Sequence, residues 1–464
     1  MEMVFTLFLL IVFSIFGSIL GLVTGMLPGI HVNMVALLLL VWAPLIVESV
    51  INELSLVNDV WLATILICVV ILSASVVHTF VDFIPSIFFG APDEDTVLSV
   101  LPGHQMLLKG QGYKAVVLSA YSSFMATILS FSLLIPAFLL IGEPLNLYVF
   151  IKRNIFWLLV VVVSFLLLSE NGGREKDEKR NFSCLTKVRD FLKPRFKALF
   201  LFLISGSLGL VIYLFPLSGV IELRVSALFS ALTGLFGVST LFLSILTSPK
   251  LPKQHIPKKE RRDYKTLFKN DFLKNSLKGT IAGSVVGFLP GVSSSHAAVI
   301  SSFSLKRKKR RNECFIVVIS SINTANAFFC LVALFLILRP RNGAVIAINK
   351  LLMISESGNG SVAISPEFFL LLIGVLVASL FGLYSTLFLG KVVASRINSF
   401  SYKKTMGLVL IVIFLVVYLF TGFYGLVILL VSALVGLLPP LLGVRRSHLM
   451  GVLLFPVIVY FSPF

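Results

Sequence analysis

Charged side chains are scarce in this chain. Asp, Glu, Lys and Arg together make up 13% of the 464 residues, whereas about a quarter is usual in a soluble domain. Hydrophobic residues make up 57%. This balance excludes an ordinary soluble domain. We expect an all-α polytopic membrane protein of the cell membrane, because a helix satisfies its own backbone hydrogen bonds inside a bilayer.

Cysteine is rarer still, with four residues at Cys68, Cys184, Cys314 and Cys330. No two of them have C-x-x-C spacing, which excludes a disulfide framework and a cysteine-based zinc site. His31 likewise lacks a second ligand at zinc spacing and more simply hydrogen-bonds a carbonyl. We therefore expect no metal site and no cofactor, unless Na⁺ or H⁺ serves as a coupling ion.

Neither Lys nor Arg occurs before Lys109, so the loop around Glu48, Glu53 and Asp59 is acidic only. The formal charge of +18 comes from short loops between apolar segments, which is typical of cytoplasmic loops. The lipid bilayer, rather than nucleic acid, is therefore the expected partner of these charges. The first apolar run has no basic n-region and no cleavage site, which predicts a retained helix rather than a signal peptide. The strongest basic segments are residues 170–197, 250–278 and 306–311.

A glycine motif, G-x-x-x-G-x-x-x-G-x-x-P-G, occurs twice without a gap. Glycines four residues apart lie along one stripe of a helix and let another backbone come close. Pro-Gly then ends the helix, because proline has no N–H and clashes with the preceding turn. Helix packing with a kink would explain a single copy. Two copies favour a pair of broken helices at a transporter binding site. The copies are Gly17, Gly21, Gly25, Pro28 and Gly29, and Gly279, Gly283, Gly287, Pro290 and Gly291.

Polar residues follow each break. A helix that starts after Pro-Gly presents unpaired N–H groups and its positive dipole end, which favour a carboxylate or phosphate. Exposed carbonyls at the broken ends suit a sodium ion. We expect the substrate to bind among Gly25, Pro28, Gly29, His31 and Asn33 of the first copy, and Gly287, Pro290, Gly291, Ser293, Ser294, Ser295, Asn323 and Asn326 of the second.

The two copies are expected to face opposite sides of the membrane. The first is followed by the acidic loop near Glu48 and the second by the basic run 306–311, so loop charge predicts two inverted-topology repeats. The expected division is a first transmembrane repeat at 1–169, a basic cytoplasmic linker at 170–197, and a second repeat at 198–464 with its basic loop at 250–278. A weaker match at constant offset aligns Ser73, Ser75, His78 and Pro92 with Ser321, Asn323, Asn326 and Pro340.

Hydropathy predicts about 10 to 14 membrane segments, some of them broken or re-entrant. The first three spans are expected at 3–24, 30–47 and 60–77. The following stretch, 78–92, is short, carries ionisable groups and ends in prolines. We expect it to enter the membrane without crossing.

Ionisable residues in this stretch are candidates for ion or proton coupling. His78 and Asp82 are four residues apart and share a helix face, so they either move a proton or form a satisfied polar pair. Asp93 and Asp95 are further coupling candidates, although a solvated loop explains them as well. With Glu94 between them, they could also hold a divalent cation on a lipid diphosphate in a membrane enzyme.

Three further segments, 84–86, 91–93 and 101–115, follow the first glycine motif in a set order. With both Pro-Gly breaks, they resemble the large permease subunit of tripartite tricarboxylate transporters, particularly an archaeal-type member, over nearly the whole chain. The resemblance implies a secondary carrier for carboxylates such as citrate, working with a small membrane subunit and an extracytoplasmic binding protein. Residues 93–95 and 339–343 depart from the family pattern.

The residues and the resemblance together predict a function. We expect a secondary active permease, not an enzyme, that moves a small anionic solute, by the resemblance a carboxylate, across the cytoplasmic membrane by alternating access. A translocase for polyprenyl phosphate is the first alternative, because related families with paired Pro-Gly hairpins carry such lipids. The membrane enzyme is a second, which the duplication disfavours, since catalysis needs no two-fold pseudosymmetry.

Overall fold

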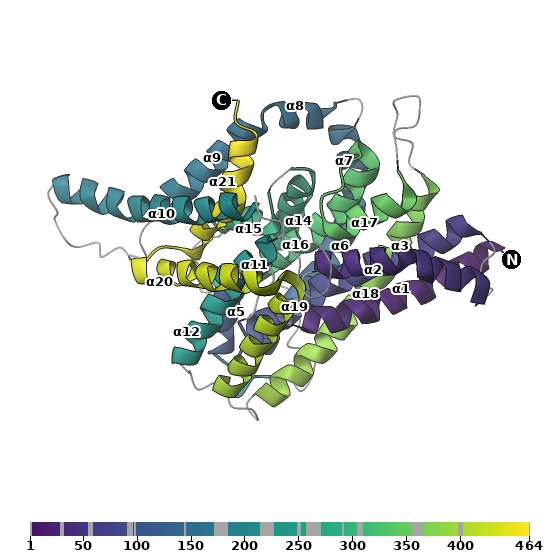
Figure 1. Ribbon diagram of the computed structural model, residues 1–464, viewed down its shortest axis with the longest axis horizontal. Helices are drawn as coiled ribbons and strands as arrows, with labels where there is room; N and C mark the ends of the chain where they lie inside the picture. Colours follow the sequence, from purple (N-terminus) through teal and green to yellow (C-terminus); the bar gives the residue numbers. More distant parts are fainter. Residues whose placement is uncertain are drawn as a thin grey trace.

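The computed structural model describes residues 2–27, 32–53, 59–90, 96, 99–142, 145–170, 184–213, 227–247, 252–256, 271–289, 292–303, 310–354, 365–397 and 402–463. Every regular element in this part of the chain is helical (Figure 1). The expected all-α class is therefore confirmed.

Within the described ranges, seven helices are long and apolar enough to cross a bilayer, or up to eight spans if one bent pair is counted as a span. Four shorter apolar helices, of 10 to 17 residues, lie within the described ranges. The chain is thus a multi-pass integral membrane protein, but its long spans are fewer than the ten to fourteen segments expected. The candidate spans are Met3–Met26, Val60–Phe88, Gly112–Ser132, Leu192–Ile212, Arg311–Ile337, Pro366–Arg396 and Met406–Leu442.

A first bundle contains both copies of the glycine motif. Its two most extensive contacts join α1 to α3 and α14 to α16, while α18 packs on α3 and α6 packs on α16. One large hydrophobic core runs through all of these helices. The bundle comprises α1 (Glu2–Met26), α2 (Val32–Glu48), α3 (Val60–Val81), α4 (Phe83–Phe88), α5 (Val100–Leu107), α6 (Gly112–Ser132), α14 (Asp271–Phe288), α15 (Ser294–Phe303), α16 (Arg311–Ile337), α17 (Gly343–Leu352) and α18 (Pro366–Arg396).

The first glycine stripe packs directly on the backbone of α3. A Cβ added at Gly17 would lie closer than 3.0 Å to Val70 backbone atoms, and one at Gly21 would meet Ala74 in the same way. A Cβ added at Gly25, one turn further, would lie 3.1 Å from the His78 carbonyl oxygen and from the Val81 Cβ. Because side chains are missing along the stripe, the two helices approach more closely than larger residues would allow.

The second glycine stripe packs on α16 in the same way. Gly279 meets the backbone of Val318, and Gly283 meets that of Ile322. A Cβ added at Gly287 would lie 2.7 Å from the Cβ of Phe329. These partners stand at the same offset from their first-copy counterparts that aligns Ser73 with Ser321, so the sequence match extends to the packing of both helix pairs.

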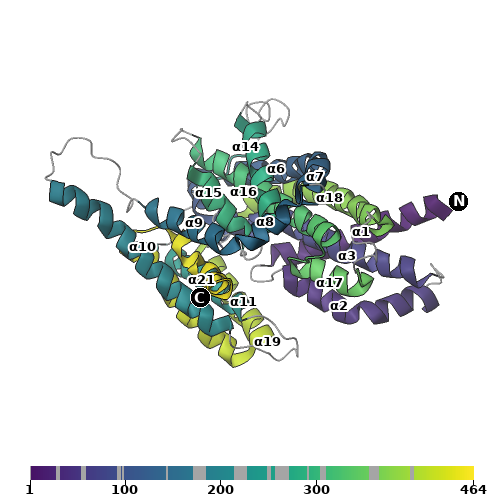
Figure 2. The ribbon, with the colours of Figure 1, turned by 90° about the horizontal axis from the view of Figure 1, so that it is seen from above.

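A second bundle holds α10 (Cys184–Tyr213), α11 (Leu228–Leu232), α12 (Ser239–Thr247), α19 (Tyr402–Gly436) and α21 (Gly451–Tyr460). Figure 2 shows α10, α11, α19 and α21 together on one side, away from α1, α2 and α3. Its apolar clusters are distinct from the large core of the first bundle. Four smaller elements complete the pattern: the π-helices Ser49–Glu53 and Thr233–Val238, α20 (Leu438–Leu442) and the 3-10 helix Arg446–Met450.

Residues 78–88 do not form a re-entrant segment, and that expectation was wrong. They continue α3 into α4 as one candidate span of 29 residues, Val60–Phe88. The Asp82 N–H donates to the His78 carbonyl at 3.0 Å, and the Ser86 N–H donates to that of Asp82 at 3.2 Å, so the helical ladder carries on through the turn. Pro85 lies in the first turn of α4, where a missing N–H costs little.

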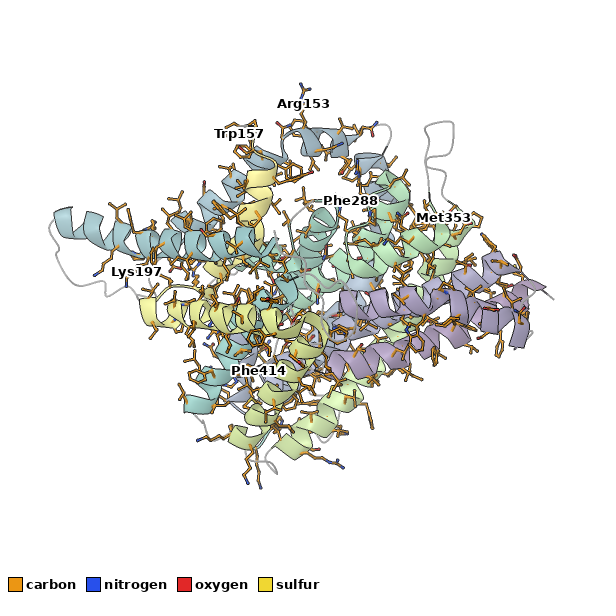
Figure 3. All side chains as sticks on the ribbon, in the orientation of Figure 1. Arg153, Trp157, Lys197, Phe288, Met353 and Phe414 are labelled. Atoms are coloured by element: carbon orange, nitrogen blue, oxygen red, sulfur yellow. The ribbon has the colours of Figure 1, made fainter. Side chains whose placement is uncertain are left out.

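The sharp bend lies elsewhere. Helices α8 (Leu147–Arg153) and α9 (Ile155–Leu168) are long and apolar enough to cross a bilayer only when taken together. They meet at 71° across Asn154. Arg153 and Trp157, which flank this bend, lie at the edge of the molecule in Figure 3. The short helix α7 (Leu134–Ile141) precedes this pair.

A substitution in the second glycine stripe tests the close packing. We expect Gly283→Ala to lower the melting temperature of the purified protein, because its methyl group would overlap the Ile322 carbonyl and overpacking costs about 1 to 3 kcal/mol. Gly407→Ala is the matched control, since no atom lies within 4 Å of a Cβ there. Equal melting of the two variants in detergent would contradict the packing argument.

Candidate functional site

The second-copy residues Ser294, Asn323 and Asn326 come together in the first bundle. The Asn326 Nδ2 donates to Ser294 Oγ at 3.0 Å, and Ser294 Oγ donates to Asn323 Oδ1 at 3.5 Å. Ser294 is the first residue of α15, while both asparagines lie on α16. The sequence places Pro290 and Gly291 just before this cluster, so three polar side chains stand beside the second predicted break.

The cluster keeps an unused donor. Asn323 is 1% exposed, and among the described residues its Nδ2 has no hydrogen-bond partner. A buried amide N–H without an acceptor costs free energy, and a carboxylate or phosphate oxygen would remove that cost. Ser295 is fully buried and Ser293 partly so at the start of α15. The Asn323 amide can therefore donate a hydrogen bond to an anion beside the start of α15.

The first-copy residues His78 and Gly25 also meet. The His78 ring, 2% exposed, has its Nδ1 3.2 Å from Thr24 Oγ1, and Gly25 lies against the His78 backbone. Asp82 is 4% exposed at the junction of α3 and α4. The predicted histidine and aspartate therefore share one buried region, and Thr24 is a partner that sequence reasoning did not name.

Several predicted site residues lie outside the described ranges. These are Pro28, Gly29, His31, Pro290, Gly291, Asp93 and Asp95. The backbone of Asn33 is in α2, and nothing is said of its side chain. Their assignments stay predictions.

A small cavity lies where α3, α6, α16 and α18 meet. It has room for about one water molecule,. Thr324 Oγ1 has no hydrogen-bond partner among the described residues, whereas Thr127 and Ser379 bond each other at 3.2 Å across the α6–α18 contact. The polar residues lining the cavity are Ser75, Thr79, Thr127, Thr324, Asn342 and Ser379.

Sequence reasoning missed a buried ionisable pair in the second bundle. Glu170 Oε2 lies 2.8 Å from His448 Nε2, and both side chains are 1% exposed. The same oxygen accepts from the Arg445 backbone N–H at 3.1 Å. The Ser205 Oγ donates to the His448 carbonyl at 3.2 Å. This network ties the end of α9 to α10 and to the 3-10 helix Arg446–Met450.

Comparison with known proteins gives the same family as the sequence motifs. The family model for the tripartite tricarboxylate transporter TctA family matches residues 11–451. The chain belongs to this family. It is also 30% identical to an uncharacterized protein of Methanocaldococcus jannaschii over 457 residues, which cover 97% of this chain and 98% of that protein. No solved structure matches the chain.

Family membership fixes the broad class of the protein. The TctA family comprises transporter permeases rather than enzymes. The expected family and the membrane location are therefore confirmed, while the solute and the mechanism remain to be proposed from the site.

The buried Glu170–His448 pair yields a stability prediction. We expect Glu170→Ala to destabilise the protein by about 3 to 5 kcal/mol, because it leaves a buried partner without its counterpart. Thermal melting in detergent measures the loss. As a control, Glu367→Ala removes a carboxylate whose contact with Trp61 Nε1 is exposed, and such surface changes cost about 0.5 kcal/mol or less. A Glu170→Ala protein that melts like this control would refute the structural role of the pair.

Proposed function

We propose that this TctA-family protein is a secondary active permease that moves a small anionic solute, specifically a carboxylate, across the cytoplasmic membrane by alternating access. The observation that carries the proposal is the Ser294–Asn323–Asn326 cluster. It joins a buried spare N–H donor to the start of a helix, and both favour an anion.

The substrate site of the proposal extends over both halves of the duplication. In the second half it includes Gly287, Pro290 and Gly291 with Ser293, Ser294 and Ser295, and the two asparagines. In the first half it includes Gly25, Pro28, Gly29, His31 and Asn33. The contact between α3 and α16 in the first bundle supports a joint site, since these helices carry the polar residues of the two halves.

Two inverted repeats are the proposed basis of alternating access. The matching glycine contacts of α1 on α3 and α14 on α16 support this. So does the correspondence of α18 packed on α3 with α6 packed on α16. On this basis the repeats at 1–169 and 198–464 have their equivalent helices in α1–α6 and α14–α18. The linker 170–197 and the loop 250–278 would lie in the cytoplasm.

Coupling to Na⁺ or H⁺ is assigned to the first half. His78 is buried and hydrogen-bonded to Thr24 at the end of α1, and Asp82 is buried one turn later. Intramembrane ionisable residues commonly mark proton or ion pathways. Asp93 and Asp95 are proposed as further members of this pathway.

The proposed partners follow from the family name. A tripartite system has three components, and we propose that this permease works with a small membrane subunit and an extracytoplasmic binding protein. Co-purification of such subunits with the intact permease would test this part of the proposal.

Loop orientation tests the inverted repeat. We expect cysteines introduced in a cysteine-free background as Glu53→Cys and Lys309→Cys to react with a membrane-impermeant reagent from opposite sides. The reason is that the first copy is followed by acidic residues and the second by a basic run, and basic loops stay in the cytoplasm. Labelling of both positions from one side would rule out the inversion.

Substitutions in the polar cluster test the substrate site. Ser294→Ala should weaken carboxylate binding by about 1 kcal/mol or somewhat more, the scale of one hydrogen bond to a charged group. Replacing Gly29 or Gly291 by Val should abolish uptake into proteoliposomes while the protein stays folded, because a side chain would hold backbone N–H groups away from the ligand.

Ser284→Ala is the control for these variants, because Ser284 is partly exposed and its hydroxyl donates to the Ile281 carbonyl within α14. Normal uptake by both glycine variants would count against the site. Binding of polyprenyl phosphate but of no carboxylate would replace the proposed solute with the lipid alternative.

A further inference from the structure

Arg341 reaches the second predicted break from a different part of the chain. It lies between the end of α16 and Asn342, the N-cap residue of α17. Its Nη2 donates to the carbonyl of Phe288, the last residue of α14. Phe288 lies near the centre of the molecule in Figure 3. The guanidinium therefore contacts a residue, Phe288, that precedes the Pro290–Gly291 step by two positions in the sequence.

The other two guanidinium nitrogens, Nε and Nη1, are buried, and the Tyr148 hydroxyl lies close enough to the guanidinium to affect its pKa through a hydrogen bond. Nε and Nη1 have no hydrogen-bond acceptor among the described residues, and within the same ranges no carboxylate pairs with the side chain. A guanidinium carries five N–H donors in a fixed planar fork that matches the two oxygens of a carboxylate. Buried charged donors without acceptors are costly, so this arrangement favours an anionic ligand.

Burial lowers the pKa of the Arg341 guanidinium, while the nearby Tyr148 hydroxyl opposes the shift. An arginine side chain stays protonated in proteins, so the guanidinium beside Phe288 carries a positive charge.

The surroundings of Arg341 connect it to the polar cluster. Cys330 is close enough to affect the pKa of Arg341, and its thiol lies 3.7 Å from Asn326 Oδ1. Asn326 in turn donates to Ser294. On the other side, Asn342 lines the small cavity between α3 and α16. Arg341 therefore stands between two groups of polar residues that contain unpaired donors.

The two halves of the duplication differ at this position. The offset that aligns Pro92 with Pro340 places Asp93 opposite Arg341. The first half thus carries an acid where the second carries a base, and only the second can bind an anion through this residue. Asp93 lies outside the described ranges, so this comparison rests on the sequence.

We propose that Arg341 binds one carboxylate of the transported solute through its Nε and Nη1 donors and thereby sets the selectivity for anions. This inference rests on the proposed function, because it names the charged anchor of the same site. The bond from Nη2 to Phe288 holds the fork in place beside the break.

Removing the same interaction from protein and from ligand gives the sharpest test. Purified wild-type protein, Arg341→Gln and Arg341→Lys are titrated with citrate and succinate and with their monomethyl esters. We expect Arg341→Gln to weaken the binding of citrate and of succinate at least tenfold. Arg341→Lys should weaken it less, because it keeps the charge but loses the planar fork. For the wild type the ester should bind more weakly than the acid, and for Arg341→Gln the two should bind alike, as expected for coupled groups.

Arg339→Gln is the matched control, since this exposed residue lies two positions away and should leave binding unchanged. Melting temperatures separate a structural role from recognition. If Arg341→Gln melts lower but binds citrate as tightly as the wild type, the inference is overturned. If Arg341→Gln fails to fold, the Arg341→Lys variant decides. Unchanged affinity of Arg341→Lys for citrate and succinate overturns the inference.

The outcomes also separate this inference from the proposed function. A wild-type protein that binds and transports carboxylates, with Arg341 variants that do so equally well, contradicts only the role of Arg341. A wild-type protein that binds no carboxylate contradicts both. Binding of polyprenyl phosphate in place of carboxylates, whether or not it depends on Arg341, also overturns the carboxylate assignment.

Discussion

Direct contact between glycine stripes and neighbouring backbones is the constraint on which the first bundle depends. Gly21 on Ala74 and Gly283 on Ile322 leave no room for a Cβ. Because lipid tails are as apolar as leucine, close packing rather than the hydrophobic effect holds such helices together. The same contacts fix the axial positions of α1 along α3 and of α14 along α16. They thereby place Gly25 against the buried His78 of α3 and Gly287 against Phe329 of α16.

Much of the helical architecture could be predicted because hydropathy and loop charge are local properties of the sequence. The error at residues 78–88 had a local cause: proline in the first turn of a helix is indistinguishable, by composition, from proline that ends one. Of the candidate site, Ser294 was predictable from its place after the second Pro-Gly break. Asn323 and Asn326 were predictable from the constant-offset match with Ser75 and His78. Glu170 and His448 were not, since a pair formed across 278 positions leaves no periodic pattern. Arg341 was not predictable either, because it lies in the segment 339–343 that departs from the family pattern.

The two bundles distribute polar chemistry differently. Among the described residues of the first, the buried polar side chains are mostly those of Ser, Thr and Asn, and the buried ionisable ones are His78 and Asp82. In the second, a glutamate and a histidine are buried in one network, and Lys197 donates to the Leu442 carbonyl at 2.9 Å. Removal of one charged partner is costly, so the second bundle resists rearrangement within itself.

The α6–α18 contact is held by hydroxyl groups that also have acceptors on their own helices. Ser379 Oγ donates to the Val375 carbonyl at 2.7 Å, and Thr127 Oγ1 donates to the Ser123 carbonyl at 3.3 Å. A hydroxyl with a carbonyl one turn earlier can give up a bond between helices without leaving its proton unpaired. Sliding of α6 along α18 would therefore exchange one hydrogen-bond partner for another instead of breaking a bond outright. The Thr127–Ser379 contact therefore opposes a shift of α6 along α18 less than a hydrogen bond without alternative acceptors would.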